Sequence, residues 1–297
     1  MNIFDGIKLN SVIDLFDTFK DEQSCIDFLE KAFWKGTPIS PFDKDSVVYK
    51  CNKRYKCKNT GRYFTIKSCI DIFKNSNVSL RKWFIAMWLY VTHKGGLSSK
   101  LLERELGLTQ KTTWNMLRKI RKACKFENEH LLSGEVEIDE TYVGGKNKNR
   151  HANKKVKHSQ GRSFKDKTPV LGLIERGGKV VAQVVKSVSR EDLEPIVLSK
   201  VNLLDTVYTD EWKAYGGLKD YYIHHIVNHG KREYVRDNAH TNTIENFWSH
   251  LKRGIIGVYR VVSRKHLQYY VNEFVFRHNT RHMKEGQLFV HLLSNLK

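Results

Sequence analysis

Apolar positions in the first part of the chain recur mostly at helical spacing. Over residues 1–35 they fall three and four residues apart, which predicts one or two helices. Residues 50–67 break this pattern with short basic runs around a turn at Asn59–Gly61, and they predict short strands. A strong helix is predicted over residues 80–93, with Ser79 as its N-cap and two glycines after its end.

Two shorter helices are predicted next, joined by a turn at Gly107–Thr109. The first begins at Ser98 or Ser99, and the second covers residues 110–124. Two short helices around a glycine-containing turn of this length are typical of a helix-turn-helix. The alternative is an ordinary helical hairpin whose basic face is solvated.

From Gly134 onward, strand patterns and helix patterns alternate. The predicted elements are a strand over 134–145, a hairpin over 167–186, a helix over 190–201, strands over 206–210 and 221–229, and helices over 241–259 and 263–281. This order predicts an α/β fold with both parallel and antiparallel pairing. On the helix that begins near Thr241, one apolar stripe is expected to pack on the sheet. It consists of Ile244, Phe247, Leu251 and Ile255.

Charge narrows the class of partner. The 52 Lys and Arg residues exceed the 32 Asp and Glu residues, giving a net charge of +20. Such an excess favours binding to a polyanion, most often nucleic acid. No apolar run reaches the roughly 20 residues of a membrane helix, and no secretory signal is evident. Five irregularly spaced cysteines argue against a disulfide framework and for a reducing compartment.

Residues 146–167 are strongly basic and lie between two predicted strands, so we expect a mobile loop that contacts a phosphate backbone. Together with the second helix of the predicted helix-turn-helix, this segment supplies the expected DNA contacts. They are Lys111, Asn115, Arg118, Lys146, Lys148, Arg150, Lys154 and Lys155.

Three acidic residues have a context suited to metal-dependent chemistry. Asp139 and Asp210 come at the ends of predicted strands, and Glu245 lies in the first turns of a predicted helix. Carboxylates so arranged can hold two divalent cations about 4 Å apart. Any one of these acids taken alone would more often be structural or solvated. Because neighbouring strand residues face opposite sides, Glu140, and with it Glu211, is expected to point elsewhere.

Several blocks in order resemble the DDE transposases of bacterial insertion sequences related to the eukaryotic Merlin elements. The blocks are EIDETYVGGK, YTDEWKAY, HTNTIENFWSHLKRGIIGVYR and HLQYYVNEFVFRHN, and the resemblance runs from about residue 79 to 281. It implies an RNase H-like fold, with Asp139, Asp210 and Glu245 as the metal-binding catalytic triad. Lys252 matches a further lysine of the family's site. The implied cofactor is Mg²⁺ or Mn²⁺, as two ions.

The family's N-terminal zinc ribbon is expected to be degenerate here. Its ligand positions read Ser40, Asp43, Cys57 and Thr60, so one thiolate remains. Serine and threonine are poor zinc ligands, and no structural zinc is expected. His278 and His282 have helical spacing but no evident third ligand.

These observations predict three domains: residues 1–75 with the degenerate ribbon, 76–128 with the helix-turn-helix, and 132–290 with the RNase H-like domain. The expected function is a transposase that binds element ends and target DNA as a homodimer or higher assembly, and cleaves and joins strands without membrane attachment. Its compartment would be the cytoplasm or nucleoid in a bacterium and the nucleus in a eukaryote. The alternatives are a repurposed, non-catalytic DNA-binding protein and a nuclease of the same fold.

Overall fold

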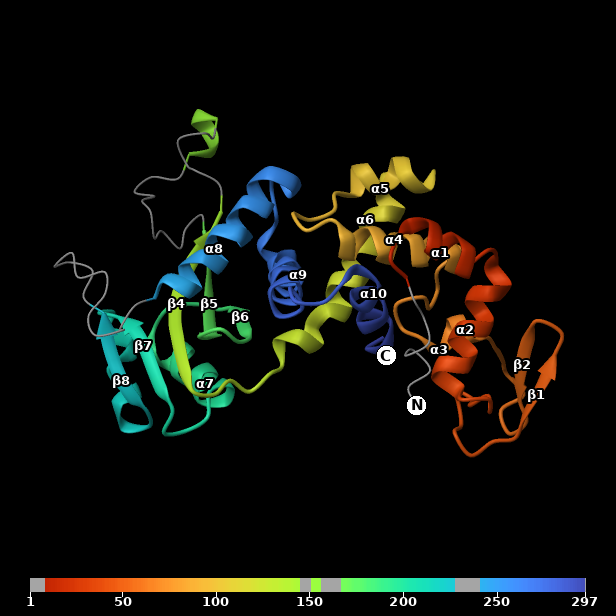
Figure 1. Cartoon of the computed structure of the whole chain (residues 1–297), viewed down its shortest axis with the longest axis horizontal. Coiled ribbons are helices and arrows are strands. Elements are labelled where there is room, and N and C mark those ends of the chain that lie inside the picture. Colours follow the sequence, from red (N-terminus) through yellow and green to blue (C-terminus); the bar gives the residue numbers. More distant parts are fainter. Residues whose placement is uncertain (1–8, 145–150, 156–166, 228–240, 297) are drawn as a thin grey trace. The chain divides into compact units, whose positions relative to one another are not determined.

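A computed structural model describes residues 9–144, 151–155, 167–227 and 241–296 (Figure 1). Contacts divide the chain into two compact units, residues 1–123 with 282–297, and residues 124–281. These units are defined by contacts alone, so the three-domain division stays a prediction. Within the described ranges, no helix has the length and apolar character needed to cross a bilayer.

The first unit is mainly helical. Its helices are α1 (Val12–Thr18), α2 (Glu22–Trp34), α3 (Ile66–Cys69), α4 (Leu80–Thr92), α5 (Ser99–Leu106), α6 (Gln110–Ala123) and α10 (Glu285–Ser294). The predicted N-cap of α4 is confirmed, because the Ser79 hydroxyl accepts a hydrogen bond from the Lys82 N–H. Phe84 of α4 packs edge-on against Phe19 and Phe289, so the C-terminal helix α10 completes the core of this unit. The sequence patterns had not predicted α10.

The turn between α5 and α6 has the length that the sequence predicts. Gly107 ends α5 in the left-handed region, with a φ of 58°, where glycine is favoured. The Thr113 hydroxyl of α6 donates to the Ser99 carbonyl at 2.9 Å and ties the two helices together. On the remaining surface of α6, Lys111 is exposed and the Arg118 guanidinium lies over the Trp114 ring.

A small antiparallel sheet completes the first unit. It has the order β1 (Val48–Cys51), β2 (Arg54–Cys57), β3 (Tyr63–Phe64). Tyr55 and Phe64 are buried and pack against Trp34 at the end of α2. Short strands are therefore present in the basic segment, and one of their two faces is covered by α2.

The second unit contains a mixed five-stranded sheet with the order β6-β5-β4-β7-β8. The strands are β4 (Glu135–Val143), β5 (Thr168–Glu175), β6 (Val180–Val184), β7 (Thr206–Asp210) and β8 (Ile223–Val227). β4, β5 and β6 pair antiparallel, whereas β7 runs parallel to both β4 and β8. The predicted α/β class with mixed pairing is confirmed, and the arrangement is compatible with an RNase H-like domain.

Helices cover both faces of this sheet. On one face α7 (Arg190–Lys200) buries Leu193 and Val197 against alternate sheet residues. On the other face lie α8 (Asn242–Gly254) and α9 (Leu267–Asn279), as Figure 1 shows. The predicted stripe along α8 is buried in this second cluster, and α8 continues as a π-helical turn over Ile255–Tyr259.

Side-chain amides cover the free edge of β6. Asn128, Gln268 and Asn279 accept hydrogen bonds from alternate backbone N–H groups of β6 at 2.7–2.8 Å. The Asn279 amide also donates back to the strand at 3.0 Å. These amides take the place of a sixth strand, so the edge has few unpaired groups to offer to another chain.

Candidate active site

The predicted acidic residues of β4 and β7 lie at the same edge of the sheet. The last pair between these parallel strands joins Glu137 and Tyr208. Asp139 and Asp210 each follow that pair by two residues, so both come where the strands separate. Parallel strands in register bring such residues side by side. Together with the start of α8 they line a cavity of about 570 Å³. Its walls are formed by Asp139, Glu140, Thr141, Asp210, Glu245, Trp248, Ser249, Lys252, Arg253 and Ile256.

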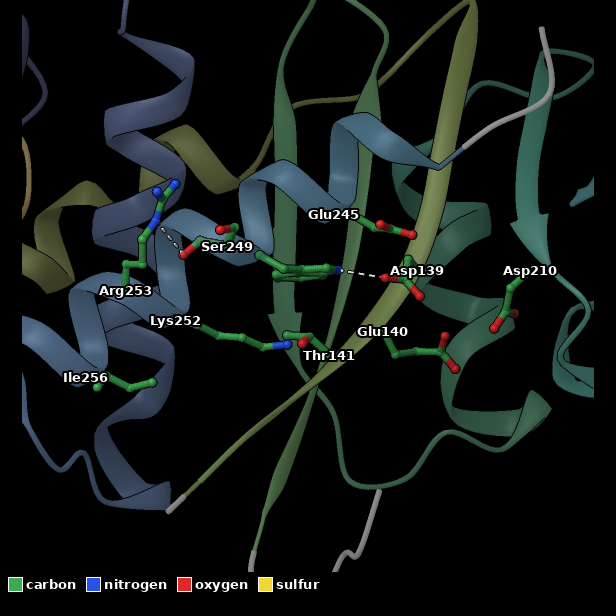
Figure 2. A pocket seen from close by; sticks show the side chains of 10 residues that line it. Asp139, Glu140, Thr141, Asp210, Glu245, Ser249, Lys252, Arg253 and Ile256 are labelled. Atoms are coloured by element: carbon green, nitrogen blue, oxygen red, sulfur yellow. Dashed lines mark hydrogen bonds between the residues drawn. The ribbon is translucent and has the colours of Figure 1, made fainter. Parts of the chain in front are cut away.

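A third carboxylate joins the two aspartates, and it is Glu140. Among the described residues, Asp139, Glu140 and Asp210 form a group whose ligand atoms all lie within 4.8 Å of one another. The prediction that Glu140 points elsewhere is therefore wrong. Glu140 does start on the opposite face, where it interacts with the buried Tyr215. Beyond the last pair between β4 and β7, however, its longer side chain reaches the space that Asp139 and Asp210 face (Figure 2).

Glu245 enters the same cavity from α8. In Figure 2 its carboxylate points from the first turns of the helix toward Asp139. It lies outside the tight group of three, and its charge is a small contribution to the raised pKa of Asp139. The structure thus places all three predicted acids around one cavity, with Glu140 of β4 as a fourth.

The start of α8 is held by a buried carboxylate from the sheet. Glu137 of β4 accepts hydrogen bonds from the backbone N–H groups of Thr243 and Ile244 at 2.9 and 3.0 Å. The Thr241 side chain forms no cap hydrogen bond, so Glu137 performs the function of an N-cap from another element. Glu137 is fully buried, and Arg176 neutralises its charge at 3.1 Å. This contact fixes α8, and with it Glu245, relative to the strand that carries Asp139.

Trp248 positions the carboxylate of Asp139. Its indole Nε1–H donates to Asp139 Oδ2 at 3.0 Å (Figure 2). The strand residue paired with Asp139 is Gly172, where a Cβ atom would come within 2.5 Å of the indole. Because Gly172 has no side chain, the indole ring can lie close to β5 and reach Asp139. A sequence pattern can indicate that Trp248 is buried, as it is, but not the direction of its N–H.

Asp210 is held by the turn that follows β7. The backbone N–H of Trp212 donates to Asp210 Oδ1 at 3.0 Å, and the Trp212 indole donates to the Val188 carbonyl at 3.1 Å. Because the indole is tied to the chain, its ring is held in place while 42% of the residue stays exposed. Glu211 between them is exposed and does not line the cavity.

The acidic cluster changes the protonation of its own members. Burial, helped by the charge of Asp210, raises the pKa of Asp139 to about 6. Burial raises the pKa of Glu140 to about 7, although the Tyr215 hydroxyl opposes that rise. Desolvation lowers the pKa of Lys252, while the negative charge of Asp139 acts in the opposite direction. Crowded carboxylates of this kind favour either a shared proton or a bound cation.

The donor set fits a hard divalent cation. The three ligand atoms that lie within 4.8 Å of one another are all carboxylate oxygens, which are the ligands that Mg²⁺ and Mn²⁺ prefer. Lys252 extends along the cavity wall toward Glu140 and Thr141 (Figure 2). The cavity therefore has carboxylate oxygens at one end and the Lys252 ammonium group on the wall beside them.

The expected DNA contacts are only partly described. Lys111 and Lys155 are exposed, Asn115 is half-buried, and Arg118 is half-buried against Trp114. Lys146, Lys148 and Arg150 lie outside the described residues, and only the backbone is described for Lys154.

The residues at the predicted ligand positions of a zinc ribbon take part in hydrogen bonds. The Asn59 side chain donates to Asp43 at 2.8 Å, and its backbone N–H donates to Ser46 Oγ at 3.1 Å. Burial would raise the pKa of the Cys57 thiol, but hydrogen bonds from Ser40, Ser46 and Thr60 lower it to about 6. Hydroxyl groups thus surround the one remaining sulfur.

Two comparisons place the chain among mobile-element proteins. Residues 131–279, about half of the chain, match the ISXO2-like transposase domain. Over 274 residues the chain is 30% identical to a Halobacterium salinarum protein described as an uncharacterized protein in transposable element ISH50. That alignment covers 88% of this chain and 92% of the relative. The matched domain contains every residue that lines the acidic cavity.

Proposed function

Because the chain belongs to the ISXO2-like transposase family, we propose that it is a DDE transposase with an RNase H-like catalytic domain. It binds the ends of its element and catalyses metal-dependent cleavage and joining of DNA strands. The observation that carries the proposal is the convergence of Asp139, Asp210 and Glu245 on one cavity within the matched domain. None of the three is close to another in sequence, so this convergence is a property of the fold.

Asp139, Asp210 and Glu245 would hold two Mg²⁺ or Mn²⁺ ions, and Glu140 adds a carboxylate beside them. When bound, such ions activate a water or 3′-hydroxyl and stabilise the leaving oxygen of a phosphodiester. The chain's own residues arrange the reactants. Trp248 restrains the carboxylate of Asp139 by donating to its Oδ2 atom. Lys252 is placed to contact a phosphate oxygen next to the carboxylates.

The α5–α6 pair is the proposed helix-turn-helix. Its second helix presents Lys111, Asn115 and Arg118, and an element end is the proposed ligand. The family and the net charge of +20 support this assignment. The basic residues between β4 and β5 would contact the phosphate backbone. An assembly of two or more copies on DNA, in the compartment that holds the host's DNA, completes the proposal.

A repurposed protein that binds DNA without cutting it is the alternative. Intact acids at all three positions argue against it, because loss of catalysis would remove the selection that keeps unpaired carboxylates in a crowded cavity. A nuclease of the same fold would share the site and differ only in lacking strand joining.

The test is a cleavage and strand-transfer assay on the element's own flanking DNA with Mg²⁺. Asp139→Asn should abolish both products while leaving metal-free DNA binding nearly unchanged, because it removes one negative charge and no phosphate contact. Glu211→Gln is the matched control, an exposed acid next to Asp210 that does not line the cavity. Equal cleavage by Asp139→Asn and the parent would refute the site. Binding without cleavage by the parent would favour the repurposed protein.

A further inference from the structure

One face of the small sheet in the first unit is both aromatic and basic. Strand pairing places Tyr49 opposite Lys56, and Lys56 opposite Tyr63, so these three side chains form a row across β1, β2 and β3. The neighbouring pair on the same face is Cys51 and Arg54. We call these five residues the outer face. Adjacent strands are about 4.8 Å apart, so the row spans roughly 10 Å.

The opposite, inner face is committed to the core. Tyr55 packs edge-on against Trp34 with ring centroids 4.9 Å apart. Its hydroxyl donates to Glu30 at 2.8 Å. The inner face is thus anchored to α2, and the outer face lies on the side of the sheet away from α2. Tyr49 and Tyr63 remain 47% and 52% exposed, which is unusual for two large aromatic residues in one row.

The charged residues of the segment that forms the small sheet all have one sign. Residues 47–67 include Lys50, Lys53, Arg54, Lys56, Lys58, Arg62 and Lys67, and no Asp or Glu. In the part of the chain that the structure describes, no acidic side chain forms a salt bridge with Arg54 or Lys56. The Lys56 ammonium lies 5.6 Å from the centre of the Tyr63 ring. Folding therefore concentrates positive charge here without neutralising it.

We propose that the outer face is a second DNA-binding surface, separate from α5–α6, and that it contacts the phosphate backbone of duplex DNA. Arg54 and Lys56 supply charge, and the Tyr49 and Tyr63 hydroxyls donate to phosphate oxygens. A two-stranded ribbon such as β1–β2 has the width to lie along or within a major groove. This proposal rests on the proposed function, which supplies DNA as the substrate.

The small sheet is held together by hydrogen bonds and by α2, and this fits a binding surface that needs no zinc. Hydrogen bonds at Asn59 and Cys57 link the turns that carry the predicted metal-ligand positions. The sheet is held in shape by those contacts and by α2. A surface that binds backbone phosphates needs such rigidity and exposed charge, and neither depends on zinc.

The experiment measures binding of the full chain to a labelled duplex by fluorescence anisotropy, with EDTA present so that no DNA is cut. Arg54→Gln/Lys56→Gln should bind more weakly and reduce the slope of log K against log salt by about 1.8, or about 0.9 per lost contact. Tyr49→Thr/Tyr63→Thr should weaken binding with the slope unchanged, because no charge is lost. Threonine keeps the strand propensity, and circular dichroism and melting confirm that both variants fold.

The matched control is Lys20→Gln/Lys31→Gln, which removes two exposed charges from the same unit outside the outer face. It should leave the slope nearly at the parental value. Parental affinity and slope in both outer-face variants, or an equal loss in the control, would overturn the inference. Binding to polyglutamate is measured in parallel. The inference would also be overturned if the outer-face variants lost binding to polyglutamate and kept parental binding to the duplex, because that would indicate an acidic polypeptide partner. Cleavage by the parent protein in Mg²⁺ is measured separately. A negative result for the outer face would therefore leave the proposed transposase function untouched.

Discussion

Replacing Trp248 with phenylalanine removes one hydrogen bond at the acidic cavity and keeps most of the buried ring. The indole Nε1–H donates to Asp139 Oδ2 at 3.0 Å. This bond stabilises the ionised carboxylate and helps to lower the pKa of Asp139, which burial raises to about 6. The variant should therefore hold the proton on Asp139 more tightly. A divalent cation competes with that proton for the same oxygens.

The size of the effect follows from the bond that is lost. A hydrogen bond to a charged group contributes about 1.5–3 kcal/mol, and one pKa unit corresponds to about 1.4 kcal/mol. The pKa of Asp139 should rise by about one to two units in Trp248→Phe. At pH 6 the ionised fraction then falls by about 5- to 50-fold, whereas at pH 9 most of the carboxylate is ionised in both proteins.

The assay is Mn²⁺ binding by calorimetry, together with cleavage at limiting Mg²⁺, from pH 6 to 9. Trp248→Phe should bind metal more weakly at pH 6 and approach the parent at pH 9. Trp212→Phe is the control, because it loses an indole N–H that donates to the Val188 carbonyl and keeps the backbone N–H at Asp210. A pH profile of Trp248→Phe that matches the parent's would refute the role of this hydrogen bond.

Gly172 provides a second check on the same contact. A Cβ atom there would lie 2.5 Å from the outer carbons of the indole ring, which phenylalanine lacks. Gly172→Ala alone should destabilise the protein by about 1–3 kcal/mol, as overpacking does. In the Trp248→Phe background the cost should be much smaller, and the shifted pH profile should remain. Additive losses in the double variant would show that the two residues do not compete for this space.

Three further outcomes are expected. Glu137→Gln should lower the free energy of unfolding in urea by about 3 kcal/mol, because it replaces the buried charge at the start of α8 with a neutral amide and leaves Arg176 with Glu135 as a carboxylate partner; a loss under about 0.5 kcal/mol, the range of ordinary surface changes, would contradict its role. Asp139 and Glu140 have raised pKa values in the folded protein, so the folded state binds more protons, and metal-free stability should fall as pH rises from about 4 to 7. Added Mg²⁺ should reverse this fall above pH 7, and Asp139→Asn should flatten it in thermal melts. Elemental analysis should find no stoichiometric zinc, since Cys57 is the one thiol at the predicted ligand positions; one zinc per chain would disprove this.

Local patterns in the sequence were enough to find most elements and to single out Asp139, Asp210 and Glu245. Short apolar runs located β4 and β7, whose central residues are buried on both faces, and period-3.6 hydrophobicity located α8, which buries one stripe. The prediction that both aspartates end their strands is right for Asp210 and wrong for Asp139, which lies in the middle of β4. The two meet because β4 and β7 stop pairing two residues before each of them. The stripe from Ile244 to Ile255 placed Glu245 on the adjoining polar face of α8.

The tertiary structure decided which groups meet at the acidic cavity. Alternation along β4 excludes Glu140, yet the strands separate there and its side chain reaches Asp139 and Asp210. Nothing local marks Glu137 as the cap of α8, because its partners lie more than 100 residues later in the chain. The link between Trp248 and Asp139 likewise needs Gly172 on a third element. Sequence periodicity reports which side of an element is buried, whereas hydrogen bonds between elements depend on positions that only the packed sheet and helices define.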